Sequence, residues 1–156
     1  MSRLYEKETN LTVTNRLRVP PQGTFMHAGS VETLILGKQL TLEDSGKTLF
    51  LALAGGFTVT LPLPLAGLRY KFIVKIAPTT AYIIATNGGA DIIIGGVNEL
   101  EVDTSDDGPY DDNADKFNFV ANTAAVGDFA EFISDGTSWY VNGQVNLDGG
   151  ATMTTT

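Results

Sequence analysis

The stretch that decides the fold is GDFAEFISDGTSWYVNGQ, residues 127–144, near the end of the sequence. It holds two runs of strand-forming residues separated by Asp135 and Gly136, and an Asp-Gly pair between such runs is a strong signal for a β-hairpin. A two-residue turn at this pair predicts that Phe132 lies opposite Trp139. Because side chains alternate along a strand, the hairpin has two faces of different character.

One face of this hairpin is predicted to be core and the other to be partly exposed. The core face carries Ala130, Phe132, Ser134, Thr137, Trp139 and Val141. The opposite face carries Phe129, Glu131, Ile133, Ser138, Tyr140 and Asn142. This second set is too apolar for open water and too polar for a sealed interior. We therefore expect Trp139 to pack in the core and Tyr140 to need a partner.

The rest of the chain also has the pattern of short strands. From Val31 onward, runs rich in Val, Ile, Thr, Phe and Tyr alternate with clusters of Gly, Asn, Asp and Pro, which predicts eight to ten strands and no helix. Two further hairpins are expected, within residues 48–61 and 82–94. Residues 68–76 alternate, with Arg69, Lys71 and Lys75 on a wet face. The fold class predicted is all-β: an antiparallel β-sandwich or jelly roll, with a small barrel as a further alternative.

The 156 residues are enough for one domain with a single core. Residues 1–23 are predicted to be an extended N-terminal arm that ends at Pro20 and Pro21. Residues 24–147 form the sandwich domain in this interpretation. Residues 148–156, rich in Gly and Thr, are predicted to be an extended C-terminal tail.

The net charge of −8 comes from one segment. Residues 99–115 hold eight acidic side chains and no basic one, and elsewhere acids and bases are equal in number. We expect a mobile, solvated loop there. Residues 103–108 (DTSDDG) match the first half of a calcium loop, but Ala114 stands where its bidentate Glu belongs, so no dedicated metal site is predicted. The scattered Lys and Arg residues argue against a nucleic acid partner.

Residues that carry chemistry are sparse. His27 is the only histidine, it has no obvious partner in the sequence, and there is no cysteine. No Gly-rich phosphate loop is present either. We expect no enzymatic activity, no catalytic residue, no cofactor and no bound metal. The charged N-terminal stretch contains no apolar run, which predicts neither a signal peptide nor a membrane span, and hence a soluble protein made in a cytoplasm.

Three segments together resemble small β-rich virion proteins of tailed bacteriophages. They are LTLEDSGKTLFL (residues 40–51), GLRYKFIVK (67–75) and AAVGDFAEFISDGTSWYVNGQ (124–144). The pattern GLxYxFxV followed by GDxxxFxSDGTxWYV is similar to segments of head decoration, or cement, proteins and of some tail-associated proteins. The resemblance covers about residues 40–144, which leaves out the N-terminal arm, and the acidic segment interrupts it.

The resemblance implies a structural protein with no enzymatic role. It would be a homotrimeric β-sandwich or jelly roll on the outer surface of the capsid, made in the host bacterial cytoplasm, that stabilises the phage head across capsomers. Its partners would be copies of itself and the major capsid protein, without nucleic acid or membrane. The half-apolar hairpin face, with Phe129, Ile133 and Tyr140, is then the predicted subunit interface.

The N-terminal arm is the predicted contact with the capsid. Its basic residues are Arg3, Lys7, Arg16 and Arg18. The arm has too little apolar content to fold alone but could become ordered on a neighbour. The alternative function is a tail-associated or receptor-binding module that presents aromatic side chains to bacterial surface sugars. The sequence contains neither a recognisable attachment domain nor a long shaft, so the decoration role is favoured.

Overall fold

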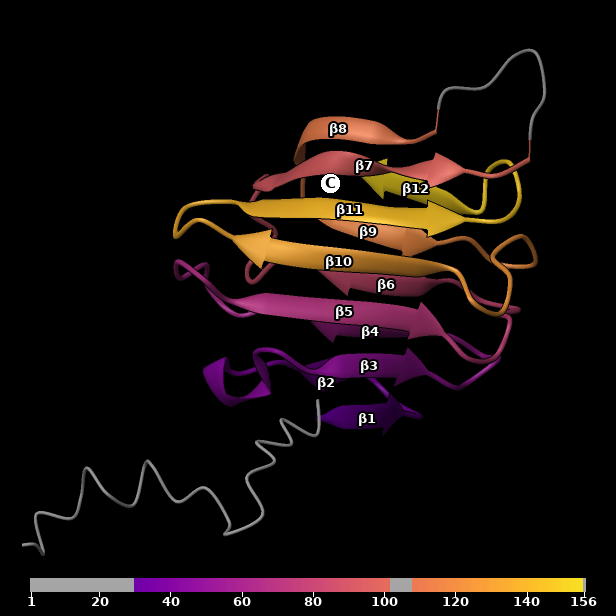
Figure 1. Ribbon diagram of the computed structural model, residues 1–156, viewed down its shortest axis with the longest axis horizontal. Helices are drawn as coiled ribbons and strands as arrows, with labels where there is room; N and C mark the ends of the chain where they lie inside the picture. The colour runs from indigo at the N-terminus through magenta and orange to yellow at the C-terminus, as the bar shows by residue number, and fades with distance from the viewer. Residues whose placement is uncertain (1–29, 102–107, 156) are drawn as a thin grey trace, which may run out of the picture.

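The computed structural model describes residues 30–101 and 108–155. The described residues form one seven-stranded and one five-stranded sheet that enclose a shared core, and Figure 1 shows the larger sheet in front of the smaller. This arrangement confirms the predicted all-β sandwich. The predicted arm residues, His27 and most of the calcium-like string lie outside the described residues: Arg3, Lys7, Arg16, Arg18, His27 and residues 103–107.

Both sheets are mixed. The larger sheet has the order β1 (Val31–Leu34), β3 (Thr48–Leu51), β5 (Arg69–Val74), β10 (Phe129–Ser134), β11 (Trp139–Val145), β7 (Ile93–Glu99) and β8 (Tyr110–Ala114). The smaller sheet has the order β12 (Ala151–Thr154), β9 (Lys116–Phe119), β6 (Tyr82–Ala85), β4 (Phe57–Thr60) and β2 (Lys38–Gln39). A single 3-10 turn, η3 (Leu42–Asp44), is the helical element of the described chain.

The first six strands alternate between the two sheets. Strands β1, β3 and β5 run parallel in the larger sheet, and β2, β4 and β6 run parallel in the smaller one. Each consecutive pair therefore forms one coil of a short solenoid-like stack. The hairpins predicted at residues 48–61 and 82–94 are wrong, because each of these segments crosses from one sheet to the other. The purely antiparallel arrangement is also wrong, because these strands pair in parallel within each sheet. The jelly-roll alternative is not confirmed.

Close contact between successive turns holds the β3–β4 connection in its crossing from one sheet to the other. The carbonyl oxygen of Ala54 accepts hydrogen bonds from the backbone N–H groups of Thr79 (2.6 Å) and Thr80 (3.2 Å), which stacks the β3–β4 turn on the β5–β6 turn. Gly56 is required between them, since its φ is +64° and a Cβ there would lie 2.1 Å from the Thr80 oxygen. The Tyr82 hydroxyl also joins the two turns, because it accepts from the Leu53 N–H and donates to the Ile76 carbonyl.

A four-residue ionic network links β1, β2 and the 3-10 turn η3. The Lys38 ammonium lies 2.8 Å from Glu32 and 2.9 Å from Asp44, and the Lys47 ammonium contacts the same two carboxylates. Asp44 is buried and also accepts a hydrogen bond from the Thr41 N–H at 2.9 Å. Burial alone would raise the pKa of Asp44, but the hydrogen bonds from Lys47 and Lys38 outweigh it and hold that pKa well below its usual range.

Phe132 of β10 is fully buried where the two sheets meet. Its ring lies edge-on to Phe72 of the neighbouring strand, with centroids 5.6 Å apart, and to Phe117 of the opposite sheet at 5.8 Å. Inward-facing residues of both sheets surround this contact. Leu49 of β3 and Val59 of β4 are both buried in the shared core, one from each sheet, whereas a hairpin would have placed them on different faces.

The predicted last hairpin is present, but its register differs by two residues. Ser134, rather than Phe132, pairs with Trp139, and residues 135–138 form the connection. The Asp135 carboxylate sets this longer loop, since it accepts hydrogen bonds from the Thr137 and Ser138 N–H groups, each at 2.8 Å. A shift of two residues leaves every side chain on its predicted face.

Two boundaries differ from those expected from the sequence. Within the acidic segment, residues 110–114 form strand β8, and Ala114 and Asp115 are buried, so the prediction of a loop is wrong for this part. At the other end, β12 pairs with β9 and Ala151 is 2% exposed, so the sandwich continues past the predicted boundary at residue 147. The described residues contain no helix with the length and apolar character that crossing a membrane requires.

We expect Phe132→Ala to lower the free energy of unfolding by about 3–5 kcal/mol, because it removes a buried ring that joins the two sheets and leaves a cavity. Urea unfolding followed by tryptophan fluorescence measures the effect. Phe50→Ala, which removes a half-buried ring from the outer surface, is the matched control and should cost clearly less. Equal costs for the two variants would contradict the role given to Phe132.

We expect Asp44→Asn to lower the free energy of unfolding by about 1–3 kcal/mol at neutral pH, since it removes charge-assisted hydrogen bonds from two lysines. The folded pKa of Asp44 lies below its unfolded value. Its contribution is therefore fully present above about pH 4 and is lost as the pH falls through the folded pKa.

Urea midpoints between about pH 7 and pH 2 test this pH dependence. The difference between wild type and Asp44→Asn should shrink as the pH falls. Glu43→Gln, at the exposed neighbouring acid, is the control and should leave stability almost unchanged. A difference that is independent of pH would contradict the ionic role of Asp44.

Candidate interaction surface

The candidate site is the outer face of the seven-stranded sheet, meaning the side that points away from the core. Alternation along the strands fixes which side chains reach it. They are Val31, Thr33, Thr48, Phe50, Arg69, Lys71, Ile73, Ile94, Asn98, Tyr110, Phe129, Glu131, Ile133, Tyr140, Asn142 and Gln144. This outer face contains an apolar part over β3, β5, β10 and β11, and a polar hollow over β7, β8 and β11.

The three predicted interface residues all lie on this outer face, and Glu131 separates Phe129 from Ile133 along β10. Ile133 pairs with Tyr140 across β10 and β11, and Phe129 lies further along β10. Ile133 is 42% exposed and Tyr140 is 46% exposed. Phe129 is half-buried, with the Lys71 ammonium 4.6 Å from its ring centroid. Their position on the outer side of the hairpin is thus as predicted.

Two residues that sequence reasoning missed extend this apolar surface. Phe50 pairs with Ile73, and Ile73 pairs with Phe129, so the three form a continuous row across β3, β5 and β10. The Lys75 ammonium lies 5.9 Å from the Phe50 ring centroid. Ile73 was missed because alternation along residues 68–76 placed it on the solvent-facing side with Arg69 and Lys71. Phe50 was missed because the hairpin predicted at residues 48–61 paired it with β4 instead of β5.

The hydroxyl of Tyr140 finds its partner within its own hairpin. It donates a hydrogen bond to the Asp135 carboxylate at 3.3 Å, and the ring stays exposed. Backbone N–H groups of Ser138 and Thr137 lower the pKa of Asp135 to about 2. The charge of Asp135 in turn raises the pKa of Tyr140. Trp139 is fully buried, with its ring centroid 5.6 Å from that of Tyr70, so the prediction that it packs in the core is confirmed.

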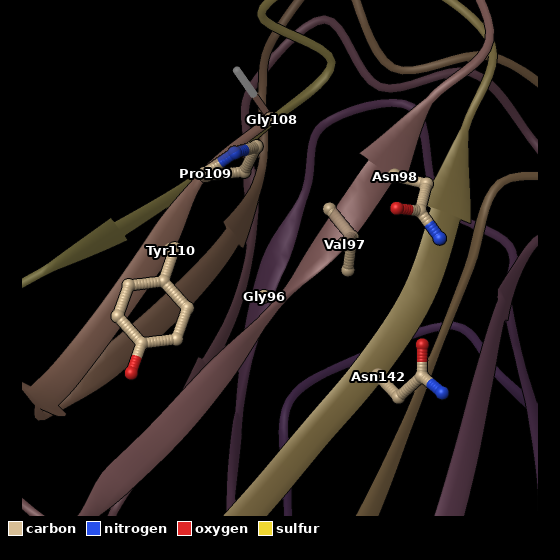
Figure 2. A pocket seen from close by; sticks show the side chains of 7 residues that line it. All are labelled: Gly96, Val97, Asn98, Gly108, Pro109, Tyr110 and Asn142. Atoms are coloured by element: carbon tan, nitrogen blue, oxygen red, sulfur yellow. The ribbon is translucent and has the colours of Figure 1, made fainter.

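The polar hollow is a pocket of about 360 Å³ (Figure 2). It is lined by Gly96, Val97, Asn98, Gly108, Pro109, Tyr110 and Asn142. Gly96 of β7 pairs with Asn142 of β11 on one side and with Tyr110 of β8 on the other. Since Gly96 carries no side chain, none stands between Asn142 and Tyr110 on the outer face.

Sequence patterns did not predict this pocket. Tyr110 follows a run of acidic residues, which suggested a solvated loop, yet it begins an edge strand and is 73% exposed on the outer face. Gly96 is part of a Gly-Gly pair that resembled a turn, whereas it lies inside β7. A Cβ at Gly96 would lie 2.4 Å from the Pro109 oxygen, so close approach of β8 requires glycine there.

The described residues contain no group of three or more His, Cys, Asp or Glu side chains that could hold a metal ion. No protein-family model matches the chain, and a search of curated proteins finds no significant match. The resemblance to phage virion proteins therefore stays a prediction.

Proposed function

We propose that this chain is a structural virion protein that decorates the outer surface of a tailed-phage head. In this proposal it acts as a homotrimeric cement protein, without enzymatic activity, and binds the major capsid protein across neighbouring capsomers. The proposal combines the three sequence segments that resemble decoration proteins with the character of the outer face. The character of the outer face is the structural observation that supports the proposal.

The supporting observation is the apolar surface around Phe129, Ile133 and Tyr140. Aromatic residues and arginine are enriched in the centres of protein interfaces. Here exposed Ile133 lies between Tyr140 on one side and Arg69 on the other, on a rigid sheet. Contact with further copies of the chain would remove this apolar surface from water, which supports a self-association role.

The edge formed by β1 and β2 supports a second contact. Exposed apolar side chains cluster in and after β1, with Val31 at 63%, Ile35 at 62% and Leu36 at 64% exposure. Strand β1 ends the larger sheet, so one of its sides is open to another strand. The basic arm joins the sandwich next to this edge in sequence. We infer that the arm and the β1 edge together form the capsid-binding region.

We expect the purified protein to sediment as a trimer at micromolar concentration. Tyr140→Asp should weaken association by at least about tenfold, because it places a charge in a largely apolar contact. Thr58→Asp, on the exposed outer side of the smaller sheet, is the matched control and should leave the trimer intact. Sedimentation as a monomer would contradict the proposed interface.

We expect a chain that starts at Gln22 to fold and trimerise but to bind empty capsids far more weakly than the full chain. Three arms acting together can strengthen binding by a factor of about 10²–10⁴ over a single arm, so their loss should be easy to measure. Co-sedimentation with capsids tests this. A full-length variant with Arg3, Lys7, Arg16 and Arg18 changed to Glu separates the effect of charge from that of length.

Two outcomes would contradict this role of the arm. Equal capsid binding by the full and shortened chains would remove the arm from the contact. Absence of capsid binding by either chain would contradict decoration and favour the tail-associated or receptor-binding alternative.

A further inference from the structure

We propose that the pocket between β7, β8 and β11 binds an uncharged sugar ring. This site goes beyond the decoration role and does not depend on it. Tyr110 and Asn98 lie outside the hairpin face proposed as the subunit interface, and Asn142 lies on that face, between the positions of Phe129 and Tyr140. Its three recognising side chains are Tyr110, Asn98 and Asn142, arranged around Gly96 (Figure 2).

Tyr110 provides the stacking surface. Its side chain is 73% exposed at the edge of the sheet, so its ring is accessible to a ligand. The face of an aromatic ring is electronegative, and the C–H groups on one side of a pyranose ring carry the complementary positive partial charge. A sugar that lies flat on Tyr110 would cover apolar surface and leave its hydroxyl groups directed sideways, toward β7 and β11.

The two asparagines provide the polar contacts. Asn98 and Asn142 are both exposed on the same side of the sheet, on adjacent strands. Each amide offers two donor hydrogens and an acceptor oxygen, which suits a pair of neighbouring hydroxyl groups that both donate and accept. Strand spacing puts the Cα atoms of Asn142 and Tyr110 about 10 Å apart, on either side of Gly96. One ring can therefore contact the tyrosine and an amide together.

The shape and charge of the pocket narrow the ligand class. Its volume of about 360 Å³ falls at the small end of the roughly 300–1,000 Å³ typical of small-molecule sites. The described lining contains amides, backbone groups, one aromatic ring and no charged side chain. A phosphate or carboxylate would have no cation to bind there, whereas a neutral sugar requires none.

Titration of the full-length protein with simple sugars tests the proposal. The probes are methyl glycosides of glucose, galactose, mannose and N-acetylglucosamine, with glucose 6-phosphate as the charged probe, followed by ligand-observed NMR and calorimetry. We expect saturable binding of at least one neutral glycoside in the millimolar range. Tyr110→Ala should weaken it by about tenfold, which corresponds to the loss of one aromatic contact, and Asn142→Ala should weaken it similarly.

Two controls separate recognition from general effects. Tyr110→Phe keeps the ring and should retain most of the affinity. Asn118→Ala removes an amide of the smaller sheet, on β9, and should leave binding unchanged. The proposal is overturned if no neutral glycoside saturates the wild type, if glucose 6-phosphate binds as well as the neutral sugars, or if Tyr110→Ala binds like the wild type. None of these outcomes depends on capsid binding.

Discussion

The contact of Phe132 with Phe72 and Phe117 is the interaction on which the rest of the structure depends. It is where the central strand of the larger sheet meets the smaller sheet, at centroid distances of 5.6 and 5.8 Å. Because side chains alternate along a strand, burying Phe132 forces Phe129 and Ile133 to point outward. A slip of one residue would reverse both assignments at once, so the buried ring also determines the composition of the outer face.

The outer face divides into two regions with different chemistry on one rigid support. The apolar row of Phe50, Ile73 and Phe129 crosses the strands on one side of β10, whereas the hollow over Gly96 lies on the far side of β11. Strand β11 contributes Tyr140 to the first region and Asn142 to the second. A protein partner that covers the apolar row could therefore leave the edge near β8 accessible to a small ligand.

Features set by local alternation could be predicted from the sequence, and features set by turn direction could not. The burial of Trp139 and the exposure of Tyr140 follow from the period-two pattern alone. The crossing from β3 to β4 has the same sequence pattern as a hairpin, and it is contacts with the next turn, through Ala54 and Tyr82, that distinguish the two. The register of the last hairpin depended on the Asp135 side chain. Tyr110 was missed because its acidic neighbours made a strand look like a loop.

The position of β10 and β11 in the larger sheet has a consequence for synthesis on the ribosome. These strands come late in the sequence, yet they fill the gap between β5 and β7, which are made much earlier. Until residues 129–145 emerge, β5 and β7 each lack the neighbour on one side, and the aromatic core lacks Phe132. Pairing over such long sequence separations is slow. The nascent chain therefore passes through a stage with open sheet edges, during which premature association between chains competes with folding.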